Sequence, residues 1–253
     1  MGSTLFQKKL GILGGGQLGK MLLAECAKMG IYTSVLDPSE ESPCKNIANK
    51  FYCGDFRDYE TVIDFSNDCD VITFEIEQVN VDALEFLEKK GKKVYPKSKT
   101  LRTIQDKNQQ KQFFQKNNIP TADFKFFPNI SVLKSHISKD EINFPCIWKK
   151  TKFGYDGFGV KILNSSEDIN DLPDTEMIIE DFVPFEKELS VIVSRNVSGE
   201  IKCFETVEME FNPNSNQVEF VISPANISSI TNNYAKELAV KISESLDCVG
   251  LLA

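Results

Sequence analysis

The sequence predicts an α/β protein in which a Rossmann-like parallel sheet is followed by a second domain of hairpins. Up to about residue 100, short apolar runs alternate with segments of helical period, which is the pattern of βαβ units in a parallel sheet. After that, the sequence pattern changes to short apolar strands separated by turns. At 253 residues, the chain is long enough for two small domains, each with a core of its own.

In the first domain, each expected strand is a short apolar run and each expected helix carries an apolar stripe. The strands are expected at residues 10–13, 32–36, 51–53, 70–74 and 93–96. Helices are expected at residues 18–27, 59–66 and 81–89. A polar helix at about 100–117 follows them and leads into the second domain. We expect helices on both faces of this sheet, because βαβ crossovers place them there.

The second domain is expected to begin near residue 103, which gives a first domain of residues 1–102 and a second of 103–253. The turn at Asn118-Ile119-Pro120 ends the polar helix. A smaller, largely antiparallel unit is expected at about residues 123–190. Across the second domain, strands are expected at 146–149, 160–163, 177–182, 189–194, 201–209 and 217–222. A hairpin turn is expected at 196–199 and a helix at 234–246.

Composition excludes several classes of partner. The chain carries 29 basic and 37 acidic residues, and its net charge of −8 has the wrong sign for a protein that follows a phosphate backbone. No apolar run approaches the ~20 residues of a bilayer-spanning helix, and the N-terminus lacks the apolar core of a signal peptide. We therefore expect a cytoplasmic protein that binds neither nucleic acid nor membrane.

Cysteine and histidine usage argues against zinc and against a Cys-His or Ser-His-Asp mechanism. The seven cysteines contain no C-x-x-C pair, so they are expected to be free thiols. The single histidine, His136, lies in a polar stretch that is typical of a protein surface. The sequence therefore indicates no zinc site, and we assign no metal ligands to residues of this chain.

The first motif is a glycine loop between a strand and a helix. Gly14, Gly16 and Gly19 fit G-x-G-x-x-G, and Asp37 ends the next expected strand. Such glycines let a ligand approach the helix N-terminus, and the acid can bind ribose hydroxyls, as in dinucleotide-binding proteins. A glycine turn of this kind also occurs without a dinucleotide, so the motif alone leaves both interpretations open.

The second motif combines lysines with a glycine loop. Lys149 lies on an expected strand, and residues 154–159 form the loop before the next strand, so an ammonium group and backbone amides can converge on a polyphosphate. The strand that ends at Glu180 can offer peptide groups to an adenine edge, and Glu188 can accept from ribose hydroxyls. Taken singly, Glu180 and Glu188 are also consistent with ordinary surface acids.

With these motifs in this order, the chain resembles the ATP-grasp ligases, and among them the family that carboxylates 5-aminoimidazole ribonucleotide in purine biosynthesis. The resemblance covers the whole chain, and G-Y-D-G is more specific than the first glycine motif. The segments that carry it are I-L-G-G-G-Q-L-G-K-M-L (12–22), V-I-T-F-E-I-E-Q-V-N (71–80), I-Q-D-K-N-Q-Q-K (104–111), N-N-I-P-T-A (117–122), G-Y-D-G-F-G (154–159) and G-L-L-A (250–253).

The resemblance implies an α+β ATP-grasp domain after the parallel sheet, and an ATP-dependent reaction. Bicarbonate attacks the γ-phosphate to give carboxyphosphate, and the amine of 5-aminoimidazole ribonucleotide is then carboxylated. Positioning and charge stabilisation dominate phosphoryl transfer, which suits a chain that supplies lysines and amides rather than a nucleophile. In this family Mg²⁺ accompanies ATP, and a homodimer is expected for the full-length protein.

Residue roles carried over from the family fall into three groups. Tyr155 and Asp156 are the expected catalytic residues. The nucleotide substrate is expected to contact Gly16, Gln17, Leu18 and Glu75, with Glu77 a weaker candidate, and Asp37 is then no cofactor ligand. The expected ATP contacts are Lys107, Lys149, Gly154, Tyr155, Asp156, Gly157, Phe158, Gly159, Val160, Glu180, Asp181, Phe182, Val183 and Glu188.

The chain departs from the family pattern at several places, and Lys152-Phe153 replaces a small, glycine-like approach to the glycine loop. Phe158 stands where many relatives have a polar or basic residue, and Phe211 stands where they have histidine. The family continues beyond the position of Ala253 into strands that carry the magnesium ligands, so the ATP-grasp domain is incomplete here and those ligands are expected beyond residue 253. Residues 1–253 alone are therefore expected to bind ATP weakly and not to catalyse carboxylation.

Other functions remain open at the level of sequence. A different ATP-grasp ligase, such as a formate-dependent glycinamide ribonucleotide transformylase, shares the architecture and differs in the acceptor amine. An NAD-dependent oxidoreductase fits Gly14, Gly19 and Asp37 but leaves the loop at residues 154–159 without a role. A non-catalytic nucleotide-binding fragment is the third alternative.

Overall fold

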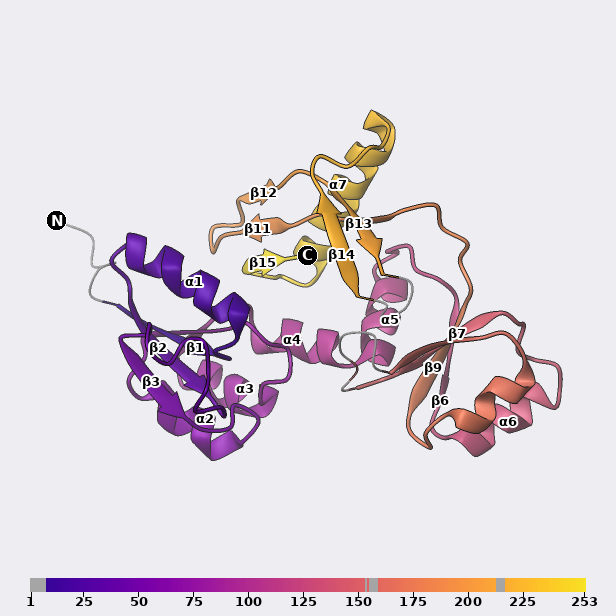
Figure 1. The fold of residues 1–253 in the computed structure, drawn as a ribbon, viewed down its shortest axis with the longest axis horizontal. Coiled ribbons are helices and arrows are strands. Elements are labelled where there is room, and N and C mark those ends of the chain that lie inside the picture. The colour runs from indigo at the N-terminus through magenta and orange to yellow at the C-terminus, as the bar shows by residue number, and fades with distance from the viewer. Residues whose placement is uncertain (1–7, 153, 155–158, 213–216) are drawn as a thin grey trace. The chain divides into compact units, whose positions relative to one another are not determined.

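The computed structural model describes residues 8–152, 154, 159–212 and 217–253. The chain divides into two compact units (Figure 1). Unit 1 is Met1–Arg102 with Cys248–Gly250, and unit 2 is Thr103–Asp247 with Leu251–Ala253. Among the described residues, no helix combines the length and the apolar character that crossing a membrane requires.

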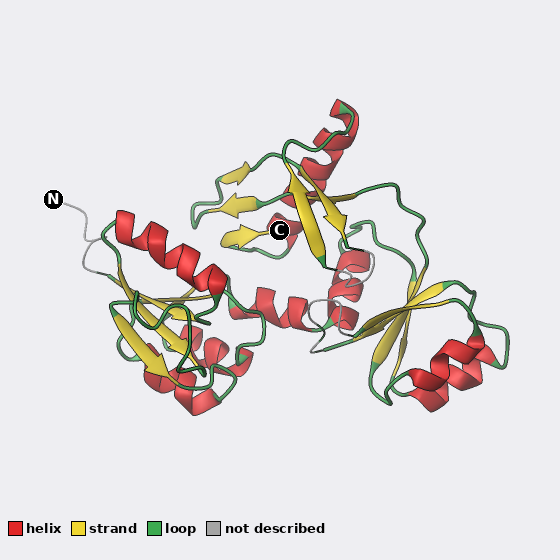
Figure 2. Ribbon diagram, in the orientation of Figure 1, coloured by secondary structure: helices red, strands yellow, loops and turns green. Residues whose placement is uncertain are grey.

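Unit 1 is built on a parallel sheet of five strands in the order β3-β2-β1-β4-β5, which confirms the predicted Rossmann-like architecture (Figure 2). The order reverses at the central strand β1, and ligands of open α/β sheets bind at the carboxyl ends of strands around such a point. The strands are β1 (Lys9–Leu13), β2 (Tyr32–Asp37), β3 (Lys50–Cys53), β4 (Val71–Phe74) and β5 (Lys93–Val94).

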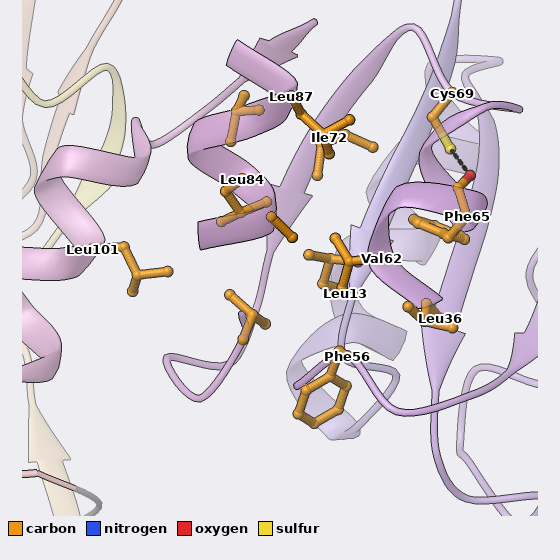
Figure 3. Packing of buried hydrophobic residues seen from close by; sticks show 13 residues of the cluster. Leu13, Leu36, Phe56, Val62, Phe65, Cys69, Ile72, Leu84, Leu87 and Leu101 are labelled. Atoms are coloured by element: carbon orange, nitrogen blue, oxygen red, sulfur yellow. Dashed lines mark hydrogen bonds between the residues drawn. The ribbon is translucent and has the colours of Figure 1, made fainter. Parts of the chain in front are cut away.

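Alternate residues of the strands supply two cores, one on each face of the sheet. Ile12 and Val35 pack with Leu23 of α1 (Gln17–Lys28). Their neighbours Leu13 and Leu36 point to the other face and join residues of α2 (Tyr59–Ser66) and α3 (Val81–Lys89), as Figure 3 shows. The expectation of helices on both faces is therefore confirmed.

Three buried thiols predict alkaline instability of the fold. Burial is the main cause that raises the pKa of Cys44, Cys69 and Cys146 to about 11, from 9.0 for the exposed thiol. A raised pKa in the folded state stabilises the fold fully below pH 9, and this stabilisation is lost as the pH rises towards 11 because the unfolded chain loses its protons first.

For Cys69 alone we expect the loss to approach about 2 kcal/mol near pH 11. Urea unfolding of the unsubstituted chain and of Cys69→Ala at pH 8 and pH 10.5 measures it. The free energy of unfolding is expected to fall less with pH in the variant. Equal falls in both proteins would show that Cys69 ionises as easily in the folded chain as in the unfolded one.

The predicted polar helix over residues 100–117 is wrong as a single element. It is two helices, α4 (Ser98–Gln105) and α5 (Lys107–Lys116), with a break at Asp106. The Asp106 carboxylate accepts from the N–H groups of Asn108 at 3.0 Å and Gln109 at 3.1 Å, so it caps α5. A capping acid inside a helix-forming stretch therefore starts a new helix here.

The antiparallel part of unit 2 is a sheet of four strands in the order β6-β9-β7-β8, and its antiparallel pairing agrees with the expectation. Helix α6 (Ile130–Ile137) and the 3₁₀ turn η2 (Ser166–Asp171) contribute Leu133 and Ile169 to its core. The sequence prediction missed α6, η2 and β6. The strands are β6 (Phe124–Phe127), β7 (Cys146–Lys150), β8 (Val160–Leu163) and β9 (Met177–Asp181).

Two strands that the sequence predicted as continuous are each divided between two sheets. The stretch 189–194 becomes β10 (Glu188–Ser190) and β11 (Val193–Arg195), and 201–209 becomes β12 (Ile201–Cys203) and β13 (Val207–Phe211). β10 and β13 form a sheet with β14 (Val218–Ile222), whereas β11 and β12 join β15 (Gly250–Leu252). The single long strands were therefore wrong, because the chain changes sheets within each of them.

The predicted hairpin turn and the last helix are present. β11 and β12 are antiparallel, and the N–H of Gly199 donates to the Asn196 carbonyl at 3.0 Å in the turn between them. Helix α7 (Ser229–Ser245) begins five residues before the predicted start at 234, because the Ser228 hydroxyl accepts from the Thr231 N–H and caps it.

Candidate functional site

In unit 1, the glycine loop lies at the carboxyl edge of the sheet, and two carboxylates occupy its N–H groups. The Gly15 N–H donates to Asp37 Oδ2 and the Gly16 N–H donates to Glu75 Oε1, both at 2.8 Å. Gly14 has a φ of +95°, and a Cβ there would lie 2.8 Å from Glu75 Oε1, so a side chain would displace that carboxylate. The Glu75 side chain therefore occupies the space that a glycine at position 14 leaves free, and it accepts a hydrogen bond from the same loop.

This arrangement argues against a dinucleotide at the loop. A pyrophosphate at the N-terminus of α1 would have to displace both carboxylates and would face their negative charge. The Asp37 carboxylate accepts hydrogen bonds from the Gly15 N–H and from the Ser39 N–H, the latter at 2.8 Å. Asp37 therefore stabilises the loop and does not present a free carboxylate to a ribose. The geometry thus disfavours the NAD-dependent oxidoreductase.

The segment after β2 holds the loop from its other side. The buried Ser42 hydroxyl donates to the Gly15 carbonyl at 2.7 Å, and the Cys44 N–H donates to the same oxygen at 3.3 Å. After burial, the nearby carboxylates of Glu75 and Asp37 contribute to the raised pKa of Cys44, which keeps it a neutral thiol. The loop is therefore fixed before any ligand arrives.

The structure brings together most of the expected substrate contacts. Gly16 and Glu75 are hydrogen-bonded, and Gln17 and Leu18 are exposed in the first turn of α1. Glu75 is half-buried, and its carboxylate stands at the edge of the sheet. Such a group suits an amine or a hydroxyl of a ligand, because a carboxylate only accepts hydrogen bonds. Glu77, two residues on, is exposed.

In unit 2, Lys149 and Glu180 meet across the antiparallel pair β7 and β9. Ile147 lies opposite Glu180 in the register, so Lys149, two residues on, shares a face with Glu180. Lys149 Nζ lies 2.9 Å from Glu180 Oε2. Glu180 is 5% exposed, so this is a buried carboxylate and the interpretation as a surface acid is wrong.

The sequence analysis missed Lys111, the second cation on Glu180. Lys111 Nζ lies 3.2 Å from Glu180 Oε1 and donates to the Thr121 hydroxyl at 2.6 Å. Burial is the main cause that lowers the pKa of Lys111, although Glu180 opposes it. Lys107 and Lys111 are four residues apart in I-Q-D-K-N-Q-Q-K, which places them on one helix face, and that spacing was the available signal.

Lys107 opens α5 and ties the helix to the end of β7. Its N–H donates to the Thr151 carbonyl at 2.8 Å. The carboxylate of Asp106 just before it lies 3.5 Å from Lys152 Nζ. Asp106 was also missed by the sequence analysis, although D-K at the start of a helix is a recognisable cap. The basic segment after β7 and the start of α5 are therefore neighbours.

The glycine hairpin between β7 and β8 is described only at its two ends. Tyr155, Asp156, Gly157 and Phe158 lie outside the described residues. Val160 opens β8 opposite Lys149 in the register, and the Lys150 N–H donates to the Gly159 carbonyl at 2.9 Å. The ends of the hairpin thus lie beside the lysine that is expected to bind phosphate.

Gly159→Ala is expected to weaken nucleotide binding through the backbone. Gly159 has a φ of +83°, and an added Cβ would lie 3.3 Å from Lys150 Cβ and 3.4 Å from Gly154 Cα. We expect about 1–2 kcal/mol less stability, because residues with a side chain rarely adopt this conformation. Gly199→Ala is the matched control, since Gly199 has a φ of +88° and open space around it.

Both variants are expected to lose a similar free energy in urea unfolding, and only Gly159→Ala to lose affinity for ADP. Equal ADP affinity in the two variants would separate the hairpin from nucleotide binding.

The remaining expected ATP contacts follow β9. Asp181 is the last residue of β9 and is exposed, and Phe182 and Val183 follow it with exposed side chains. This stretch presents apolar surface and peptide groups, which suit a flat base. Glu188 opens β10, in a different sheet from Glu180, and is half-buried.

Within the described ranges, no group of three or more His, Cys, Asp or Glu residues is placed to hold a metal ion. The acids of unit 1 that lie closest to the glycine loop already accept backbone N–H groups, and Glu180 is paired with lysines. The donor set on these residues therefore does not fit Mg²⁺.

The two units match two known domain families. Residues 7–105 match the ribonucleotide synthetase preATP-grasp domain, and residues 112–253 match the ATP-grasp domain. The N5-carboxyaminoimidazole ribonucleotide synthase of Synechocystis sp. is 34% identical over 96% of this chain, which spans 61% of that protein.

Solved structures agree in sequence and in fold. The N5-carboxyaminoimidazole ribonucleotide synthetase of Thermotoga maritima has 38% identity and a TM-score of 0.85 over 96% of this chain and 63% of its own. The Aspergillus clavatus synthase in complex with ADP and 5-aminoimidazole ribonucleotide has 32% identity and a TM-score of 0.87 over 96% of this chain and 64% of its own.

The chain thus spans somewhat less than two thirds of the length of these relatives. Both domain matches lie in the expected order, and the likeness extends along nearly the whole chain. We conclude that the chain belongs to the ATP-grasp family and is similar, along nearly its whole length, to N5-carboxyaminoimidazole ribonucleotide synthases.

Proposed function

We propose that the whole gene product that carries residues 1–253 is an ATP-dependent ligase that carboxylates 5-aminoimidazole ribonucleotide. A bicarbonate oxygen attacks the γ-phosphate, ADP leaves, and carboxyphosphate results. The amine of 5-aminoimidazole ribonucleotide then takes the carboxyl group, and phosphate is released with N5-carboxyaminoimidazole ribonucleotide. The observation that carries this proposal is the likeness, over 96% of the chain, to a synthase in complex with ADP and the aminoimidazole substrate.

The geometry supports a division of labour between the units. In unit 2, Lys149 and the ends of the glycine hairpin provide cationic and peptide groups for the phosphates. In unit 1, the Glu75 carboxylate suits the amine or ribose hydroxyls of the acceptor. We assign catalytic roles to Tyr155 and Asp156 from their place in the G-Y-D-G motif.

We also propose Mg²⁺ as the ion that accompanies ATP, a homodimer as the full-length assembly, and the cytoplasm as the location. When bound, Mg²⁺ neutralises charge on the β- and γ-phosphates. Because the described residues do not fit this ion, we propose that its carboxylate ligands lie outside them.

The decisive experiment measures ADP release by the whole gene product, with and without bicarbonate and 5-aminoimidazole ribonucleotide. We expect ADP release that requires both. ADP release that requires glycinamide ribonucleotide and formate would show that the protein is a transformylase and not the proposed carboxylating ligase. No ADP release with any of these acceptors would refute an ATP-dependent ligase of this kind.

Glu75→Gln tests the acceptor site within the same assay. Glutamine keeps an oxygen for the Gly16 N–H but removes the charge, so we expect the KM for 5-aminoimidazole ribonucleotide to rise about tenfold while the KM for ATP stays unchanged. Glu77→Gln is the matched control, two residues on and exposed. Equal effects of the two substitutions would remove Glu75 from the acceptor site.

A further inference from the structure

One buried carboxylate in unit 2 is held by two lysines. The Glu180 side chain is 6% exposed, that of Lys111 is 12% exposed and that of Lys149 is 28% exposed. Lys149 Nζ lies 2.9 Å from Oε2 and Lys111 Nζ lies 3.2 Å from Oε1. The cluster of Glu180, Lys111 and Lys149 therefore carries one positive charge more than its carboxylate neutralises.

The two lysines differ in how firmly they are held. Lys111 lies on α5, is the more buried, and also donates to the Thr121 hydroxyl at 2.6 Å. Lys149 is the more exposed and lies on β7 opposite Val160, beside the ends of the glycine hairpin. Of the two, Lys149 is the cation that can turn away from Glu180 towards a ligand.

If Lys149 turns to a phosphate, Glu180 loses its closer partner. A buried carboxylate without a counter-charge is strongly unfavourable, so the move requires a second cation that stays in place. Lys111 meets this requirement, because its ammonium group is already 3.2 Å from the other oxygen of Glu180. Without Lys111, Glu180 would hold Lys149 and compete with the phosphates for it.

We propose that Lys111 is a positioning residue that neutralises Glu180 and thereby frees Lys149 to bind the phosphates of the nucleotide. The inference rests on the proposed nucleotide site, in which Lys111 had no assigned role. Because Lys111 acts on the phosphates only through Lys149, its loss should affect binding of the phosphates and not binding of the base.

The test compares ADP with adenosine, which lacks phosphates, in the whole gene product. Lys111→Met keeps most of the side chain and removes the charge, and Lys111→Arg restores the charge. We expect Lys111→Met to weaken ADP binding about tenfold or more and to change adenosine binding by less than about twofold, as measured by calorimetry and by ligand-observed NMR. Lys111→Arg is expected to retain most of the ADP affinity.

Two further variants separate this role from a structural one. Lys116→Met removes an exposed lysine from the same helix and is expected to leave both affinities unchanged. Thr121→Val removes the hydroxyl to which Lys111 donates, and tests whether this hydrogen bond contributes to ADP affinity. In a Glu180→Gln background, Lys111→Met is expected to cost no further ADP affinity, because the charge that it compensates is gone.

The outcomes distinguish the inference from the function on which it rests. If the unsubstituted protein binds no ADP, the proposed nucleotide site fails and the inference fails with it. If it binds ADP and Lys111→Met binds it equally well, the inference alone is wrong. Equal losses of ADP and adenosine affinity, or a full further loss in the Glu180→Gln background, would show that Lys111 supports the fold of the site without freeing Lys149.

Discussion

Glu180→Ala is expected to lower the free energy of unfolding by about 3–5 kcal/mol, because removal of one partner from a buried charge cluster leaves the other unpaired. Glu180 is 5% exposed and lies between Lys149 and Lys111. Its loss would leave the ammonium group of Lys111, whose side chain is 12% exposed, with only the Thr121 hydroxyl as a polar partner among the contacts described above. Urea unfolding followed by circular dichroism measures the effect.

Glu210→Ala is the matched control for Glu180→Ala, because Glu210 is also a strand glutamate but is exposed on β13. We expect the control to lose less than about 1 kcal/mol, as is usual for surface substitutions. Adding Lys111→Met to Glu180→Ala is expected to recover part of the lost stability, since it removes the unpaired cation. Equal losses for Glu180→Ala and Glu210→Ala would mean that both lysines reach water when the carboxylate is absent.

Lys149→Ala is expected to weaken ATP and ADP binding roughly 10- to 150-fold and to change the free energy of unfolding by less than about 1 kcal/mol. A charge-assisted contact to phosphate is worth roughly 1.5–3 kcal/mol, which gives this range. Stability is preserved because Glu180 keeps Lys111 at 3.2 Å. Nucleotide titration and urea unfolding of the whole gene product check the two halves of the prediction.

Lys125→Ala is the matched control for Lys149→Ala. Lys125 is an exposed lysine on β6 of the same four-stranded sheet, and we expect its removal to leave nucleotide affinity unchanged. If Lys149→Ala binds nucleotide as well as this control, Lys149 serves only to neutralise Glu180. The proposed phosphate contact would then have to come from Lys107 or from the glycine hairpin.

The sequence by itself determined the parallel sheet of unit 1. The helices Tyr59–Ser66 and Val81–Lys89 begin and end at the predicted residues, because apolar periodicity and the capping residues Asp58 and Asn80 act within a few positions of the chain. The glycine motifs and the lysine at 149 were also identified from sequence, since a motif is defined by particular residue types in a particular order.

Only the tertiary structure decided where chain segments change partners. The predicted strand over 189–194 is locally continuous, yet β11 pairs with β15, whose residues lie more than fifty positions away. A pairing of this kind depends on the position of a distant strand, which the apolar alternation within the stretch does not indicate. The break between α4 and α5 differs in kind, because the cap at Asp106 that causes it is a local feature of the sequence.

The charge cluster around Glu180 shows the same division between sequence and structure. Sequence identified Glu180 and Lys149 from the order of motifs, but the burial of Glu180 and its second cation depend on how α5 packs beside β9. Likewise, Asp37 matched a ribose ligand by spacing, whereas the fold turns its carboxylate onto the Gly15 N–H. Motifs specify which groups are present, and long-range packing decides which of them are already paired when a ligand arrives.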